Sequence, residues 1–278
     1  MFFYRFGIML KNKALYWLRK LGLMHVVDRV NFFLHKNRHS ARNKKFIADH
    51  PGLKLPPSYI LYEAHRMDYE NYYNQGKDTA SWLANQLGSY LPNDHIKLLD
   101  WGCGPARVVR HLLPILPEAK IYASDYNAET ITWCRQNIPG IDFSLNKLNP
   151  PLAYTDNFFD AVYALSVFTH LSEASHIEWR NEIYRILKPG GILLVTTQGQ
   201  AFTMKLTAAE RNDFEKGKLV VRDKVLEGHR SFSAFQPESF MQKFFSENFN
   251  LLKLEKGSLF KWGPEQDTWI VQKKIISG

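Results

Sequence analysis

The chain has 278 residues, 45% of them hydrophobic and 23% charged, with a formal net charge of +9. This length and hydrophobic content suit one globular α/β domain with additions. Cys103 and Cys134 are the only cysteines, which excludes a disulfide framework and fits a reducing compartment such as the cytoplasm. No run reaches the roughly 18 apolar residues of a spanning helix. Arg5 and Lys11 interrupt the N-terminal apolar run, which argues against a signal peptide.

The positive charge is concentrated at the start of the chain. Residues 1–50 contain 11 Lys and Arg against two acidic residues, and this difference equals the whole net charge. The rest of the chain holds 25 basic and 25 acidic residues and is neutral overall. We therefore predict a separate basic arm over residues 1–50 and a main domain over residues 51–278.

The arm also shows apolar residues at helical spacing. We expect a first helix that ends near Gly22, a second helix over residues 25–34 and a basic connector over residues 35–45. Two interpretations of the first helix stay open: its apolar stripe packs on the main domain, or it makes a peripheral contact with a membrane whose anionic lipids attract the basic residues. The stripe consists of Met9, Leu10, Ala14, Trp17, Leu18 and Leu21.

The segment Leu98–Arg107 (LLDWGCGPAR) carries the strongest functional signal. It has the strand, tight glycine turn and helix start of a nucleotide-cofactor loop. Arg107 is too bulky for the third small position of a dinucleotide fingerprint, and no GK[ST] follows as in a P-loop. The D-x-G-x-G pattern of Asp100, Gly102 and Gly104 instead suits a cofactor with an ammonium and a carboxylate. We expect Asp100 to hold the ammonium indirectly and the loop amides to hold the carboxylate.

This pattern resembles the first motif of class I S-adenosylmethionine (SAM)-dependent methyltransferases. About 20 residues further on, the strand candidate Lys120–Ser124 ends at Asp125, where a carboxylate can accept both ribose hydroxyls. Tyr126 would then lie on the adenine face. The resemblance covers residues 56–275 and implies an α/β fold: a Rossmann-like seven-stranded, mostly parallel sheet with an antiparallel last strand.

Alternating strand and helix patterns over residues 96–198 also predict a parallel sheet covered on both faces. A proline-rich linker precedes them at residues 49–57, and a lid insert follows at residues 199–235. The expected strands are residues 96–100, 120–124, 141–144, 158–164, 191–197, 249–254 and 268–273. The expected helices are residues 77–87, 105–113, 128–137, 172–187, 208–216 and 237–245.

The resemblance implies three further cofactor contacts. The amide of Asn146 would bind adenine, and Leu165 or Ala164 would pass under the cofactor. Tyr73 would contact the methionine end, with Tyr69 and Arg66 as alternatives. A turn-forming role for Asn146 and a packing role for Tyr73 stay open. Methyl transfer would leave S-adenosylhomocysteine as the product. No residues stand at metal-ligand spacing, so we expect no metal.

The segment Pro150–Leu171 (PPLAYTDNFFDAVYALSVFTHL) resembles bacterial small-molecule and glycan methyltransferases more than nucleic-acid enzymes. The preceding Asn149 completes an NPP sequence, but this lies before the fourth strand, whereas amino-group methyltransferases that act on adenine carry theirs after it. The resemblance therefore implies a small-molecule or saccharide acceptor.

A hydroxyl acceptor would gain from a general base, and His170 and His229 are the candidates, with capping or packing roles left open. We predict an enzyme that O-methylates a small molecule or a saccharide. Two alternatives stay open. An RNA methyltransferase could use the basic arm to grip phosphates, although the neutral main domain counts against it. The second is a module with the SAM-binding fold but no activity, and the intact Asp100, Gly102, Gly104 and Asp125 argue against it.

Overall fold

The computed structural model describes residue 18 and residues 21–92, 95–229 and 231–275. Of the apolar stripe predicted for the first N-terminal helix, only Leu18 and Leu21 belong to these residues. The other members, Met9, Leu10, Ala14 and Trp17, lie outside them.

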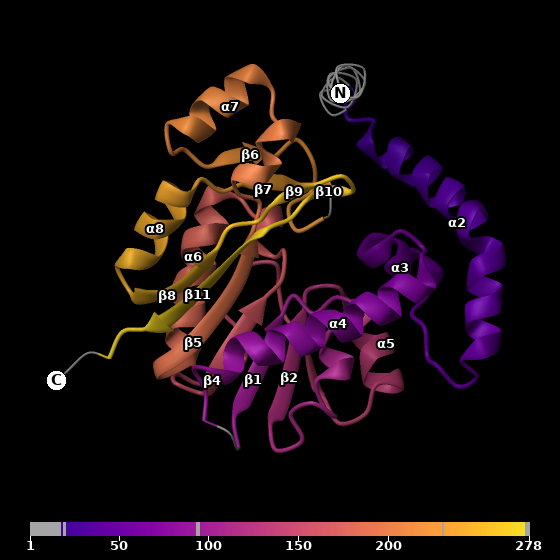
Figure 1. The fold of residues 1–278 in the computed structure, drawn as a ribbon, viewed down its shortest axis with the longest axis horizontal. Coiled ribbons are helices and arrows are strands. Elements are labelled where there is room, and N and C mark those ends of the chain that lie inside the picture. The colour runs from indigo at the N-terminus through magenta and orange to yellow at the C-terminus, as the bar shows by residue number, and fades with distance from the viewer. Residues whose placement is uncertain (1–17, 19–20, 93–94, 230, 276–278) are drawn as a thin grey trace. The chain divides into compact units, whose positions relative to one another are not determined.

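Seven strands form one mostly parallel sheet in the order β3-β2-β1-β4-β5-β11-β8, so that the last strand in the sequence lies between β5 and β8 (Figure 1). This confirms the predicted fold class. Most strands begin within one residue of the expected position, but β5 begins at Leu187, four residues early. The sheet consists of β1 (Lys97–Trp101), β2 (Lys120–Asp125), β3 (Asp142–Leu145), β4 (Phe159–Ala164), β5 (Leu187–Thr197), β8 (Phe249–Glu255) and β11 (Asp267–Lys273).

Two small hairpins and the helices complete the fold. The hairpins pair β6 (Val220–Arg222) with β7 (Ser233–Phe235) and β9 (Leu259–Phe260) with β10 (Gly263–Pro264). The α-helices are α2 (Met24–Asp49), α3 (Ser58–His65), α4 (Tyr69–Gly88), α5 (Ala128–Asn137), α6 (Glu173–Ile186), α7 (Ala208–Glu215) and α8 (Glu238–Ser246). Short 3-10 helices are η1 (Val109–His111), η2 (Phe168–His170) and η3 (Gln200–Lys205).

The chain divides into two compact units, each described by itself below. The glycine-turn unit comprises Arg29–Ala164, Trp179–Leu194 and Lys273–Gly278. The insert unit comprises Met1–Asp28, Leu165–Glu178 and Val195–Gln272. The boundary at residue 50 between arm and main domain stays a prediction.

In the glycine-turn unit, β1 pairs in parallel with both β2 and β4. Leu98 and Leu99 of β1 are completely buried, as are Ala161 and Val162 of β4. Strands buried on both faces read as continuous apolar runs, which is the pattern the sequence shows here. This core fixes the position of Asp100 near the end of β1.

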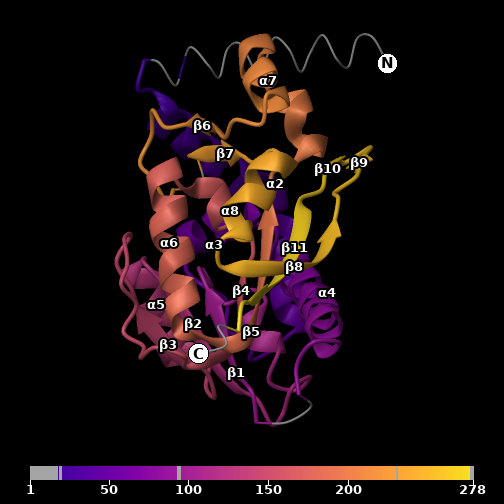
Figure 2. The same cartoon turned by 90° about the vertical axis from the view of Figure 1, so that its left-hand side faces the viewer.

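In the insert unit, α7, β6 and β7 lie side by side in both ribbon views (Figures 1 and 2). The helix expected over residues 208–216 is confirmed as α7. A capping box starts α7: Thr207 accepts the N–H of Glu210, and the Glu210 carboxylate accepts the N–H of Thr207. The insert has its own buried apolar cluster, formed by Phe202, Leu206, Phe214, Val220 and Phe235.

The prediction of a helix over residues 105–113 is wrong. Turns and the short η1 occupy this stretch. Ala106 adopts a φ of 57°, which a right-handed helix does not accommodate, so a regular helix cannot start at the glycine turn.

The N-terminal arm also differs from the expectation. The helix expected over residues 25–34 continues to Asp49, and the expected connector over residues 35–45 is helical. The segment contains no proline or glycine, and Asn43 and Phe46 are buried in it. Tertiary packing therefore extends the helix beyond what its apolar periodicity predicts.

Helix α4 begins at Tyr69, well before the expected residue 77. Asp68 caps it, because its carboxylate accepts the N–H of Asn71 at 3.0 Å. The helix runs through Gly76 without interruption.

Candidate functional site

The glycine turn after β1 is tied to the end of β2. Gly102 and Gly104 adopt φ values of 78° and 50°, in the region that favours glycine. The N–H groups of Gly102 and Cys103 donate to the carbonyl of Ser124 at 2.8 and 3.0 Å. The N–H of Gly104 donates to the carboxylate of Asp125 at 2.9 Å. These three amides are engaged within the protein, so a ligand carboxylate needs other donors.

Asp125 stands at the end of β2 and is largely buried. Besides the Gly104 N–H on Oδ2, its Oδ1 accepts the N–H of Asn127 at 2.9 Å. Burial raises the pKa of Asp125, although the N–H donors lower it. Each carboxylate oxygen keeps a further lone pair. The two backbone bonds therefore fix a carboxylate that can still accept hydroxyl protons.

Asp100 is a second buried acid in this unit. Burial raises its pKa to about 7, while Tyr163 and Arg107 act in the opposite direction. The Tyr163 hydroxyl interacts with Asp100 but completes no full hydrogen bond. A carboxyl with this pKa gains from a nearby cation, which would stabilise its ionised form.

Two further buried polar atoms near the strand ends have no hydrogen-bond partner among the described residues. They are Oγ of Ser124, at the end of β2, and Oδ1 of Asn146, directly after β3. The backbone N–H of Asn146 donates to the carbonyl of Asp125 at 3.1 Å, and its side-chain Nδ2 donates to the carbonyl of Lys147 at 2.6 Å. Buried polar atoms in proteins almost always have partners, so these two indicate room for a polar ligand.

Tyr126 follows Asp125 and is 40% exposed. Burial of its hydroxyl, followed by the charges of Asp125 and Glu63, raises its pKa to about 12. Glu63 of α3 also raises the pKa of Asp125. Helix α3 therefore brings an acidic side chain to the predicted ribose position, and the exposed Tyr126 ring is available for stacking.

Helix α4 packs directly on the glycine turn. The Tyr72 hydroxyl donates to the carbonyl of Pro105 at 2.6 Å. A Cβ on Gly76 would lie 2.1 Å from the carbonyl oxygen of Arg107. Tyr73 faces other neighbours: its ring centroid lies 4.8 Å from that of His111 and 6.2 Å from that of Phe46. Tyr73 therefore has a packing role, and its contact with a cofactor stays a prediction.

The remaining predicted residues belong to the insert unit. Leu165 directly follows β4 and is half-buried. Nδ1 of His170 lies 2.8 Å from the carbonyl oxygen of Phe232. Because a carbonyl only accepts, Nδ1 carries the proton, and Nε2 of the neutral ring has the lone pair.

His229 has the opposite arrangement. Its Nδ1 accepts the backbone N–H of Ser231 at 3.2 Å, so Nε2 carries the proton of the neutral ring. The neighbouring Gly228 donates its N–H to the carbonyl of His170 at 3.0 Å. The structure thus brings the two predicted histidines onto adjoining segments with complementary proton arrangements.

Among the residues described, no group of three or more His, Cys, Asp and Glu side chains could hold a metal ion. Cys103 and Cys134 are buried free thiols.

The family model described as methyltransferase domain matches residues 99–195, which include Asp100, both turn glycines, Asp125 and Asn146. This stretch is a class I SAM-dependent methyltransferase domain.

Relatives extend the likeness beyond this domain. The malonyl-[acyl-carrier protein] O-methyltransferase of Bacillus anthracis is 28% identical over 174 residues, which cover 61% of this chain and 62% of the relative. The chain thus spans less than two thirds of that relative's length.

Solved structures agree on the fold. A SAM-dependent methyltransferase of Methanosarcina mazei superposes with a TM-score of 0.53 at 19% identity, covering 68% of this chain and 97% of the other. The 1,6-didemethyltoxoflavin-N1-methyltransferase of Burkholderia thailandensis was solved with S-adenosylhomocysteine. It superposes with a TM-score of 0.52 at 15% identity, covering 80% of this chain and 92% of the other.

The methyltransferase domain presents groups that fit SAM. Asp100 would sit near the ammonium, Asp125 would accept the ribose hydroxyls, and the unpartnered Oδ1 of Asn146 would accept the adenine N6–H. Sequence reasoning missed Glu63 and Tyr163, which face these positions from α3 and β4. Their only sequence signal is their place on elements that flank the motif.

Proposed function

We propose that the protein transfers the methyl group of SAM to a hydroxyl of a small-molecule or saccharide acceptor. The observation that supports this most is the fixed tautomer of His170, since its Nδ1–H is held by the Phe232 carbonyl at 2.8 Å. With the proton on Nδ1, Nε2 is the basic atom of the neutral ring, as in a general base for a hydroxyl acceptor.

When bound, SAM supplies an electrophilic methyl group and its own leaving group. In this proposal, Nε2 of His170 would take the proton of the acceptor hydroxyl, and SAM would leave S-adenosylhomocysteine as the product. The Nε2–H of His229 is a donor that can orient the acceptor oxygen. Asp125 and Asn146 hold the cofactor and take no part in the proton transfer.

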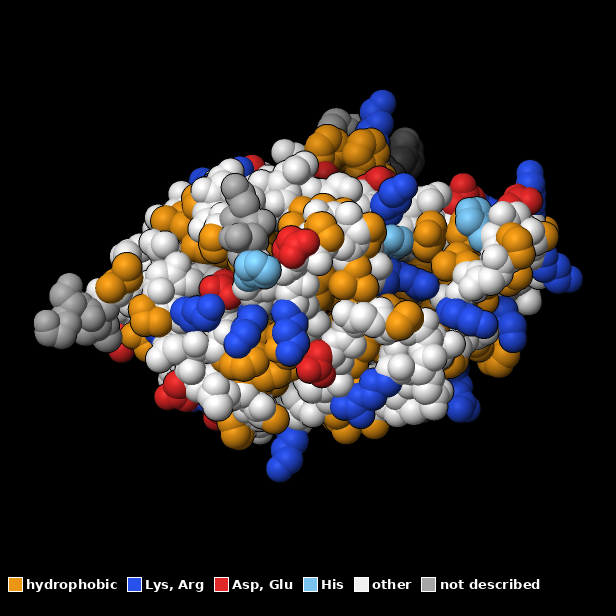
Figure 3. Space-filling view, turned by 90° about the horizontal axis from the view of Figure 1, so that it is seen from below, with side chains coloured by type: hydrophobic (Ala, Val, Ile, Leu, Met, Phe, Trp, Pro, Cys, Tyr) orange, Lys and Arg blue, Asp and Glu red, His pale blue; other side chains and the backbone are white. Residues whose placement is uncertain are grey.

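The acceptor proposed here is not a nucleic acid. A basic stripe is the usual footprint of a nucleic-acid enzyme. Residues 51–278 hold 25 basic and 25 acidic residues, and on the face drawn in Figure 3 the described Lys and Arg side chains lie among hydrophobic and acidic ones. The relative from Bacillus anthracis is named for a malonyl-[acyl-carrier protein] acceptor, which is not a nucleic acid.

We further propose that residues 1–50 form an arm that makes a peripheral membrane contact and leaves methyl transfer to the main domain. The charge of the arm supports this, because 11 basic residues meet only two acids there. None of the helices within the described residues is long and apolar enough to cross a membrane.

An acceptor screen tests the proposed reaction. The full chain is incubated with methyl-labelled SAM and separate pools of small hydroxylated molecules, soluble glycans, lipid-linked saccharides and RNA. We expect label in a hydroxyl-bearing pool. His170→Ala should lower kcat about 10²–10⁴-fold without weakening SAM binding, whereas His50→Ala, a control in the other unit, should retain turnover. Label in RNA alone, or equal turnover in His170→Ala and the parent, would contradict the proposal.

A further inference from the structure

Helix α2 presents two different faces. On one face, five side chains recur every three or four residues, and they are buried or half-buried: Phe32, His35, His39, Asn43 and Phe46. This face packs on α3 and α4 of the same unit. The ring of Phe32 meets those of Tyr59 and Tyr62 edge-on, with centroids 5.6 and 5.3 Å apart.

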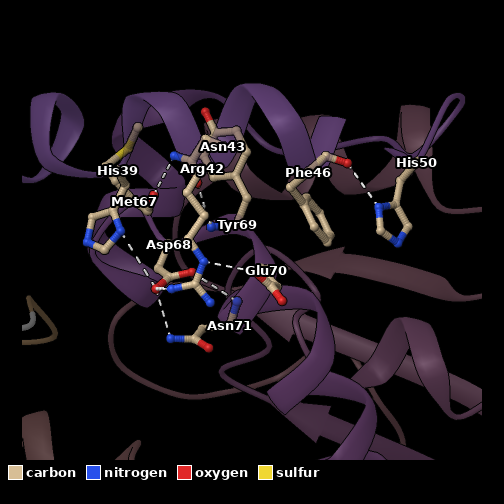
Figure 4. Close-up of polar contacts among 10 residues, drawn as sticks. All are labelled: His39, Arg42, Asn43, Phe46, His50, Met67, Asp68, Tyr69, Glu70 and Asn71. Carbon is tan, nitrogen blue, oxygen red and sulfur yellow. Dashed lines mark hydrogen bonds and ion pairs between the residues drawn. The ribbon is translucent and has the colours of Figure 1, made fainter. Parts of the chain in front are cut away.

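Polar contacts anchor the same face (Figure 4). The side-chain amide of Asn43 donates to the carbonyl of Met67 at 2.7 Å and accepts the N–H of Tyr69 at 3.2 Å. Arg42 donates to the carboxylate of Glu70 at 2.8 Å. From Arg29 onward, helix α2 is therefore attached to the glycine-turn unit by one face, and it is already helical before it meets a partner.

The opposite face of α2 is apolar and exposed. Val26, Val30, Phe33 and Leu34 follow one another at intervals of four, three and one residues and are 48–61% exposed. An amphipathic helix of a globular protein normally turns its apolar stripe toward the core. Helix α2 thus has a second apolar stripe. The described residues leave the side chains of this stripe 48–61% exposed, whereas they bury or half-bury those of the first face.

Basic side chains border this exposed stripe on both sides. At 100° per residue, Arg29 and Lys36 fall on one side of it, and Arg38 and Lys45 fall on the other, all four being exposed. Lys44 continues the line of the stripe itself and is also exposed. Helix α2 carries six Lys and Arg but only two Asp. Its outer face is thus an apolar strip between two rows of positive charge.

We propose that this outer face of α2 lies in the interface of an anionic lipid bilayer. The inference rests on the proposed peripheral contact of the arm and names the residues that make it. The aliphatic and phenyl side chains would enter the boundary of the acyl chains, and the flanking Lys and Arg would lie among the lipid phosphates.

The charge pattern favours a bilayer over a second copy of the chain. A symmetric pairing of two α2 helices would bring the same basic rows face to face, and like charges across an interface cost several kcal/mol. A bilayer offers an apolar interior with negative charge along the border of the strip. Because α2 is already folded and anchored, binding does not have to order it.

Vesicle co-sedimentation of the full chain tests this proposal, using phosphatidylcholine vesicles with and without about one-third phosphatidylserine. The stripe variant replaces Val30, Phe33 and Leu34 by Ser. Its matched control replaces three exposed apolar residues elsewhere, Ile115, Ile177 and Leu251, by Ser. A charge variant carries Arg29→Gln and Lys36→Gln. Methyl transfer to a soluble acceptor and the thermal unfolding midpoint are measured on every variant.

We expect the parent and the matched control to pellet with the anionic vesicles at low salt. The charge variant should bind about 25-fold more weakly, since each basic residue near an anionic surface contributes about fivefold. The stripe variant should bind at least tenfold more weakly, with its unfolding midpoint and methyl transfer unchanged.

Three results would overturn the proposal: no pelleting of the parent, equal pelleting on neutral vesicles, or a stripe variant that pellets like the parent. A parent that is dimeric in solution and a stripe variant that is monomeric would instead assign the face to self-association. Loss of methyl transfer in all chains with intact vesicle binding would refute only the proposed reaction.

Discussion

His176 in the insert unit shows how a buried titratable residue is kept neutral. It is completely buried. Its Nδ1 donates to the carbonyl of Ser172 at 2.7 Å, and its Nε2 accepts from the side-chain amide of Gln236 at 3.3 Å. Both ring nitrogens are thus satisfied in the neutral form, and burial lowers the pKa of His176 to about 4.

This pKa predicts a loss of stability in mild acid. In the unfolded chain His176 takes up a proton below its ordinary pKa of 6.5, but in the folded chain only below about 4. Its contribution is therefore fully present above pH 6.5 and is lost as the pH falls toward 4. Between pH 7.5 and 5, the free energy of unfolding of His176→Gln should fall by about 2 kcal/mol less than that of the parent.

Denaturant unfolding at the two pH values measures this difference. His50→Gln, a substitution of the same kind at an exposed histidine, serves as the control. Equal falls for His176→Gln and the parent would show that His176 does not contribute to acid sensitivity.

Single residues differ in how well the sequence predicts them. The positions of Asp100 and Asp125 follow from spacing, because each stands at the end of an apolar strand. Spacing does not predict the groups around these two acids, because they come from other elements. Tyr163 of β4 acts on Asp100, and Glu63 of α3 acts on Asp125. The bonds of the turn amides to Ser124 and Asp125 also depend on how β1 and β2 pair, which spacing alone does not give.

At the scale of elements, the contact of α4 with the glycine turn depends on one residue. Gly76 lies in the middle of α4, where Ala would normally favour the helix. A Cβ there would stand 2.1 Å from the backbone carbonyl oxygen of Arg107. Gly88, at the end of the same helix, has nothing within 4 Å of its Cβ position.

The two glycines make a matched pair. Gly76→Ala should lower the free energy of unfolding by about 1–3 kcal/mol, because backbone must move to admit the methyl group. It should also weaken SAM binding, since the displaced carbonyl belongs to the cofactor turn. Gly88→Ala should be neutral or stabilise by up to about 1 kcal/mol. Denaturation and calorimetry on both variants would contradict this account if Gly76→Ala behaved like Gly88→Ala.

Elements are predictable where local pattern and tertiary packing agree. The buried strands β1, β2 and β4 and the helices α5 and α6 appear where apolar periodicity predicts them. Helix α2 continues to Asp49 because Asn43 and Phe46 pack on other elements, a contact that periodicity within the segment does not reveal. The helix expected after the glycine turn fails because Ala106 takes a left-handed φ.

At the scale of the whole molecule, charge and chemistry are separated along the chain. The basic residues in excess belong to the first 50 positions, and the methyltransferase domain spans residues 99–195. We therefore expect lipid binding and SAM binding to be independent properties. The seven-stranded sheet could be predicted from the family resemblance, whereas the exposed outer face of α2 became visible only in three dimensions.

Calorimetric titration of SAM into the full chain tests the central claim, that the glycine turn and Asp125 form the cofactor site. We predict one SAM per chain. Asp125→Asn should bind about 10–100-fold more weakly, because the variant loses charge-assisted hydrogen bonds worth about 1.5–3 kcal/mol. Asp142→Asn, an exposed acid at the other end of the neighbouring strand β3, should bind like the parent. A parent that binds no SAM, or an Asp125→Asn variant with unchanged affinity, would contradict the account.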